Sequence, residues 1–166
     1  MHINATCSYY WDQFWGCSFE FDIEISGSGR IDDPYILKAI SPYDSKHFEL
    51  KISQSDQYLK IYGINLKALY LNHCTNINIS NIRVKYLEFA KCSIISVHKA
   101  QISKEMRFDQ CTDIKITKGV INRLNVFSGD QLNFYNCEIN KLSKTSKEFL
   151  KEKRIMIEVF SNGSSR

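Results

Sequence analysis

Apolar residues recur through the middle of the chain with a period of 18 or 19 residues. The first complete set comprises Leu59, Ile61, Ile64, Leu66, Leu69, Leu71 and Cys74. Eighteen residues further on stand Ile77, Ile79, Ile82, Val84, Leu87, Phe89 and Cys92. Three further sets continue the series as far as Leu142, interrupted only by small residues. One structural unit is therefore repeated along the chain, as in solenoid proteins.

The spacing inside one set separates a β-solenoid from other repeats. Steps of two residues keep side chains on one face of a strand, and steps of three turn a corner. A leucine-rich repeat needs a helical half, and the left-handed hexapeptide β-helix needs six residues from corner to corner where this chain has five. The sequence predicts an all-β fold, a single-stranded right-handed parallel β-helix of about five to six triangular coils of 18–19 residues.

The 166 residues suit a single domain in which residues 26–142 form the coils. Residues 1–25 are predicted to form an N-terminal cap and a first strand that ends in the alternating positions Phe19, Phe21, Ile23 and Ile25. An aromatic cluster precedes this strand: Tyr9, Tyr10, Trp11, Phe14 and Trp15. It fits a cap over the first coil, and the alternative is a stacking platform for sugar rings or bases.

Residues 143–166 are predicted to close the other end of the coils and to finish in a polar tail. Thr145 and Glu148 form the T-x-x-E pattern of a capping box, which opens a helix predicted over residues 146–154. A strand is expected at residues 155–159, where apolar residues alternate. Both elements would shield strand edges that otherwise template association.

The cysteines fall on positions of the repeat. Cys74, Cys92 and Cys111 share one inward column, and Cys137 shares another with Ala100 and Gly119. Free cysteine packs as a small apolar residue, and zinc sites favour local C-x-x-C pairs, which this chain lacks. We predict buried, unbridged thiols and neither a metal nor another cofactor.

Net charge and hydropathy narrow the partners and the location. The formal net charge is +4, which is too weak to indicate nucleic-acid binding, although nine basic residues fall between Arg83 and Arg123. We interpret those residues as a solvated surface. No segment has the ~18 apolar residues of a membrane span, and the N-terminus lacks a secretory signal pattern. A cytoplasmic protein without membrane contact is therefore expected.

The carboxylates give little support for catalysis. Hydrolysis of glycosides needs two carboxyl groups facing one cleft. The outward acids of the coils are Glu88, Glu105, Asp109 and Asp113. The repeat aligns Glu88 with Arg107 and Glu105 with Arg123, which predicts cross-strand ion pairs instead of a catalytic pair. We expect no catalytic residue and favour a protein that is not an enzyme.

One outward face mixes aromatic, amide, imidazole and ammonium side chains. Its candidate ligand-binding residues are Tyr58, Lys60, Tyr62, Asn78, His98, Lys115 and Tyr135. Such a face suits an extended carbohydrate, and the alternative is an ordinary solvent-exposed surface. Carbohydrate or protein are accordingly the partners that we consider, together with self-association through coil ends or faces.

Residues 26–37 read SGSGRIDDPYIL, and this stretch resembles the opening motif of archaeal and bacterial right-handed β-helix repeat proteins, the NosD-like and pectin-lyase-like group. Arg30 stands where a threonine is common in that motif. The resemblance implies the fold and says little about function. The leading hypothesis is a non-catalytic binding or structural module. The alternatives are a carbohydrate-active protein of the polysaccharide lyase or hydrolase kind and a polymerising scaffold resembling bactofilins.

Overall fold

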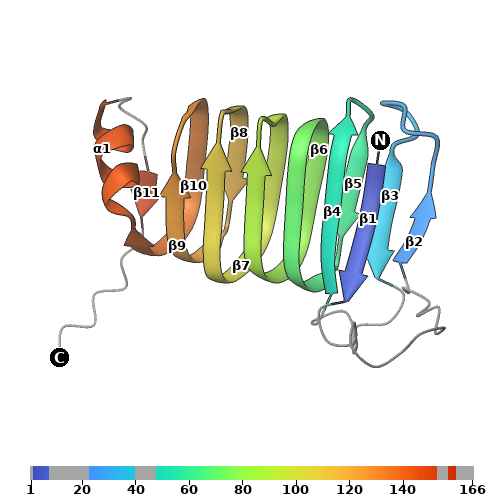
Figure 1. Cartoon of the computed structure of the whole chain (residues 1–166), viewed down its shortest axis with the longest axis horizontal. Coiled ribbons are helices and arrows are strands. Elements are labelled where there is room, and N and C mark those ends of the chain that lie inside the picture. The colour runs from blue at the N-terminus through green and yellow to red at the C-terminus, as the bar shows by residue number, and fades with distance from the viewer. Residues whose placement is uncertain (1, 8–22, 40–47, 153–156, 160–166) are drawn as a thin grey trace.

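The computed structural model describes residues 2–7, 23–39, 48–152 and 157–159. Its coils stack side by side along the long axis of the molecule, with β1 to β3 at one end and α1 at the other (Figure 1). The elements are β1 (His2–Cys7), β2 (Ile23–Ser26), β3 (Tyr35–Ala39), β4 (Phe48–Ser55), β5 (Leu59–Tyr62), β6 (Asn65–Ala90), β7 (Ser93–Asp109), β8 (Cys111–Thr117), β9 (Val120–Val126), β10 (Gly129–Leu142), α1 (Lys144–Glu152) and β11 (Ile157–Val159).

Neighbouring coils pair as parallel strands in the predicted register. Leu59 aligns with Ile77, Ile77 with Ile95, and Ile95 with Ile114, so like stacks on like from one coil to the next. The chain is a parallel β-solenoid of about five turns, which confirms the predicted fold class. This arrangement follows from the repeat, because a single coil buries its inward face only by stacking on its neighbours.

The core is the column of inward side chains that the repeat predicts, from Leu59 to Cys137. Phe89 and Phe108 stack face to face with ring centroids 5.1 Å apart, and Phe134 meets Phe108 edge-on at 6.1 Å. The core also begins earlier than the repeat indicates. Three further buried residues come from β3 and β4: Leu37, Leu50 and Ile52. They pair with the next coil and form an incomplete first turn.

Most coils turn at three left-handed backbone positions that stack in columns. Residues of the third column have φ between 51° and 66°, and they are Gly63, Asn81, Lys99, Lys118 and Asn136. The first column is Gln54, His73, Lys91 and Gln110, and the second is Asn76, Ile94, Asp113 and Gln131. The corners therefore use ordinary residues in the left-handed region, which explains how the solenoid forms with only seven glycines.

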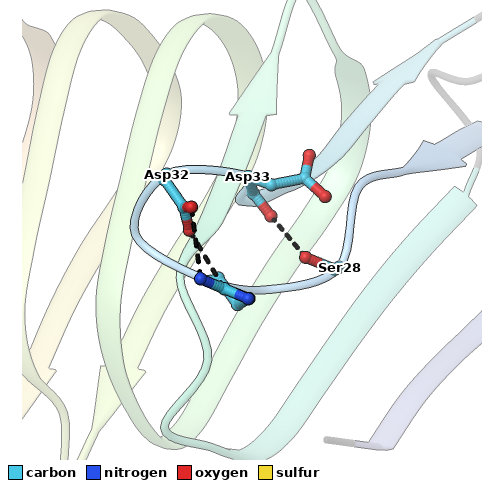
Figure 2. A network of polar contacts seen from close by, with 4 residues as sticks. Ser28, Asp32 and Asp33 are labelled. Atoms are coloured by element: carbon cyan, nitrogen blue, oxygen red, sulfur yellow. Dashed lines mark hydrogen bonds and ion pairs between the residues drawn. The ribbon is translucent and has the colours of Figure 1, made fainter.

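At the N-terminal end the strands run antiparallel. β2 pairs with β3, and β1 pairs with β4. The β2–β3 turn uses Gly27 and Gly29 at φ of 90° and 81°, and the carbonyl oxygen of Asp33 accepts three backbone N–H bonds from residues 28–30. Figure 2 shows this loop with the Arg30 guanidinium against the Asp32 carboxylate, 3.1 Å apart. The predicted aromatic cluster and residues 19–22 lie outside the described residues.

The C-terminal helix starts earlier than predicted, and its cap is a different residue. The hydroxyl of Ser143 accepts the backbone N–H of Ser146 at 3.1 Å, which makes Ser143 the N-cap of α1. Thr145 and Glu148 are exposed, so the predicted capping box was wrong. β11 pairs with β10 through Ile157 and Val159, so the predicted strand is present.

Ser146 closes the exposed edge of β9. Its buried hydroxyl accepts the backbone N–H of Val126 at 2.7 Å and donates to the carbonyl of Leu124 at 3.2 Å. The hydroxyl of Ser143 lies 2.7 Å from the Ser146 hydroxyl. One serine thus supplies the donor and the acceptor that a further coil would have offered to this edge.

Candidate functional site

The predicted binding residues come together on one flat sheet made by β3, β5 and the aligned parts of β6, β7, β8 and β10. Two outward columns run along it. The first is Ile36, Lys60, Asn78, Ser96, Lys115 and Asn133, and the second is Lys38, Tyr62, Ser80, His98, Thr117 and Tyr135. We call this surface the tyrosine face. Six of the seven predicted residues belong to these columns. Tyr58 lies before β5, where its backbone bonds to Gly29 and Tyr35.

Two exposed tyrosines mark the ends of the second column. The Tyr62 side chain is 52% exposed and that of Tyr135 is 41% exposed. They are four coils apart, a distance of about 19 Å at ~4.8 Å per coil. The positions between them carry the shorter side chains of Ser80, His98 and Thr117. Two aromatic rings therefore bracket a polar strip.

Hydrogen bonds hold the histidine at the middle of this strip. His98 Nδ1 lies 2.8 Å from the hydroxyl oxygen of Thr117, and that hydroxyl donates to the carbonyl of Val97 at 3.3 Å. A hydroxyl has one proton, so with that proton on the Val97 carbonyl the imidazole donates from Nδ1. Nε2 of His98 is then a hydrogen-bond acceptor. Further along the face, Lys115 Nζ lies 5.6 Å from the Tyr135 ring centroid, within cation–π range.

The outward carboxylates are engaged by neighbouring side chains. Glu105 accepts a hydrogen bond from the Asn125 amide at 2.6 Å, and Asp109 accepts one from the Ser128 hydroxyl at 3.0 Å. The amide thus takes the place of Arg123, the partner expected for Glu105. These contacts give both acids structural roles.

Glu88 aligns with Arg107 as predicted, but the guanidinium of Arg107 lies over the Phe127 ring at 4.4 Å. The ion pairs found within the described residues are instead Arg30–Asp32 and Lys67–Glu49. The register was therefore correct, whereas the expected ion pairs were wrong.

A second outward surface, which the sequence did not single out, surrounds Tyr70. Lys51 aligns with Tyr70, and its Nζ lies 5.5 Å from the Tyr70 ring centroid. Burial, and then the charges of Glu49 and Glu88, raise the pKa of Tyr70 above its ordinary value. Lys67 neutralises Glu49 across 2.9 Å. These contacts join neighbouring coils.

The four described cysteines are buried and unbridged, as predicted. Each Sγ donates to two backbone carbonyls, and for Cys92 these are Leu71 and Ala90 at 3.4 and 3.2 Å. Hydrogen bonds with Cys111 and Cys74, together with burial, raise the pKa of Cys92. Burial raises the pKa of Cys137. These thiols therefore belong to the core.

Metal and membrane sites were also sought among the described residues. Residues 2–7, 23–39, 48–152 and 157–159 contain no group of three or more His, Cys, Asp or Glu side chains placed to hold a metal ion. Within the same ranges no helix has the length and apolar character needed to cross a membrane.

Comparison with family models, with curated proteins and with solved structures gave no match. The class of the protein is thus defined by its own geometry, which is that of a parallel β-solenoid. What its surfaces do must be argued from the side chains that they carry.

Proposed function

We propose that this protein is a non-catalytic binding module and that its tyrosine face holds an extended carbohydrate chain along the solenoid axis. The observation that carries the proposal is the pair of in-register columns bracketed by the exposed rings of Tyr62 and Tyr135. Tyrosine joins a flat apolar ring to a polar tip, which suits the apolar face and the hydroxyl rim of a sugar.

The repeat distance of the coils supports a polymeric ligand. Coils follow one another at ~4.8 Å, which is close to the length of one pyranose ring in an extended chain. A carbohydrate lying along the face would then present about one sugar to each coil. Ser80, His98 and Thr117 offer hydroxyl and imidazole groups to the sugars between the two tyrosines.

The engagement of the acids supports a role in binding over one in catalysis. Glu105 and Asp109 each accept a hydrogen bond from a neighbouring coil, and the tyrosine face itself carries no carboxylate in its two columns. The caps support a discrete module over a filament. β1 and β2 run antiparallel to their neighbours, and Ser146 bonds to the edge of β9.

Membership of the NosD-like and pectin-lyase-like group and a cytoplasmic location are further parts of this proposal. The SGSGRIDDPYIL stretch supports the first. The four free cysteines among the described residues support the second, because reducing compartments keep thiols unbridged.

A glycan array on the purified chain, followed by calorimetry on any ligand found, tests the proposal. We expect Tyr62→Ala and Tyr135→Ala each to weaken binding by about tenfold, because each removes a stacking ring. Tyr86→Ala is the matched control, since Tyr86 is 40% exposed on another face. An empty array, or an equal loss in Tyr86→Ala, would show that the face does not bind carbohydrate.

A further inference from the structure

A groove of about 550 Å³ runs over the third corner column, beside the tyrosine face. We call it the lysine groove. The lining residues that matter here are Gly63, Asn81, Arg83, Lys99, Gln101 and Lys118. The groove borders the tyrosine face, because the backbone N–H of Lys118 bonds to the carbonyl of Tyr135 and that of Gly63 bonds to Ser80.

The groove gathers positive charge that is not neutralised locally. Arg83, Lys99 and Lys118 are all exposed, and no aspartate or glutamate lines the groove. Within the described part of the chain, none of the three forms an ion pair. The groove over the first corner column differs, because there Asp56 lies beside Lys91. The charge of the lysine groove is thus a property of this corner.

The backbone makes the choice of lysine at this corner informative. Lys99 and Lys118 occupy left-handed positions with φ of 52° and 54°. Glycine and asparagine tolerate this conformation best, and they fill the same column at Gly63, Asn81 and Asn136. Two successive coils carry lysine instead, at a conformational cost. Strain of this kind points to a functional requirement at the position.

Three successive coils contribute the cations, and adjacent coils are ~4.8 Å apart. Asn81 and Arg83 lie on the first coil, Lys99 and Gln101 on the next, and Lys118 on the third. A group with several anionic oxygens placed between these coils would accept hydrogen bonds from two ammonium groups and a guanidinium at once. The Gly63 end is open, since a Cβ there would meet nothing within 4 Å.

We propose that the lysine groove binds phosphate or sulfate groups, with Lys99 and Lys118 as the principal contacts and Arg83 as the third. The group is either a free anion or an ester carried on a polysaccharide. The site is separate from the aromatic contacts of the tyrosine face, so it stands or falls independently of the function proposed above.

Fluorescence anisotropy with labelled dextran sulfate, with labelled dextran as the uncharged probe, tests the site on the full chain. We expect dextran sulfate alone to bind, and Lys99→Asn and Lys118→Asn each to weaken it by about tenfold, as expected for loss of a charged hydrogen bond. Lys91→Asn is the matched control, because Lys91 is an exposed corner lysine with φ of 52° outside the groove. Circular dichroism verifies that each variant folds.

Equal losses in Lys91→Asn and Lys99→Asn, or equal binding of uncharged dextran, would overturn the proposal. Competition separates specific recognition from screening. Displacement by sodium phosphate beyond that by sodium chloride at the same ionic strength supports the site, and equal displacement by both salts refutes it. Phosphate that competes at micromolar concentration assigns a free anion, whereas weaker competition assigns an ester on a chain. Tyr62→Ala is expected to leave dextran sulfate binding unchanged.

Discussion

Replacing Ser55 with alanine is expected to stabilise this protein. Ser55 aligns with Cys74 at the top of the thiol column, and its residue is 2% exposed. Its hydroxyl has no hydrogen-bond partner in the described structure. A buried polar group left without a partner costs about 1–3 kcal/mol. Alanine removes that group with little change of volume, so we expect the free energy of unfolding to rise by about 1 kcal/mol.

Ser146→Ala is the matched comparison, since Ser146 is also buried but is fully hydrogen-bonded. Its removal leaves the backbone N–H of Val126 without its partner, whereas the carbonyl of Leu124 keeps a bond from the Ser143 N–H at 3.2 Å. One orphaned backbone donor and the lost hydroxyl bonds predict a decrease of about 2 kcal/mol. The same chemical change at two buried serines should therefore have opposite effects.

Urea unfolding followed by circular dichroism measures both variants against the wild type. The m-value must stay constant for the comparison to report stability alone. Ser55→Cys extends the experiment, because a thiol continues the column of Cys74, Cys92 and Cys111 and donates weakly to nearby carbonyls. A loss of stability in Ser55→Ala as large as that in Ser146→Ala would refute the reasoning from unmade hydrogen bonds.

Three further predictions concern the corners, the thiols and the cap. Lys99→Asn should raise the free energy of unfolding by about 1 kcal/mol, because asparagine adopts the left-handed corner more easily, and a lower melting temperature would contradict this. Stability should fall as pH rises above about 8.5, since the unfolded thiols ionise there while Cys92 and Cys137, with raised pKa values, keep their protons in the fold; the urea midpoint at pH 7 and pH 10 checks the slope. Truncation before Ser143 should convert a discrete species into aggregates or filaments in size-exclusion chromatography, and an unchanged assembly state would show that the segment is not a cap.

The sequence predicted the coils well because in-register stacking copies the same pattern from one coil to the next. That copying placed Cys74 beside Cys92 and brought six of the seven binding-face residues into two columns. The first turn was missed because the spacing that leads from Leu37 to Leu50 does not match the period of the later coils. Periodicity detects only those coils that have equal length.

The expected partner of Glu105 failed for a local reason. The coils alternate between 18 and 19 residues, and the register shifts between Ile102 and Met106, where the longer coil takes its extra residue. Alignment of positions then no longer fixes which side chains meet, and the Glu105 carboxylate bonds to Asn125. The helix start failed similarly, because a T-x-x-E match competed with the stronger local cap of Ser143.

The two ends of the solenoid set the length of its surfaces. Antiparallel β1 and β2 do not continue a parallel coil, so stacking stops at the first turn. At the other end, β11 covers part of β10 while the Ser146 hydroxyl meets the backbone edge of β9. A repeat that would otherwise extend by addition of coils is thereby limited to about five turns. The separation of Tyr62 and Tyr135 is fixed by the same limit, so a ligand that contacts both rings must span about 19 Å, and shorter oligosaccharides should bind through one ring only.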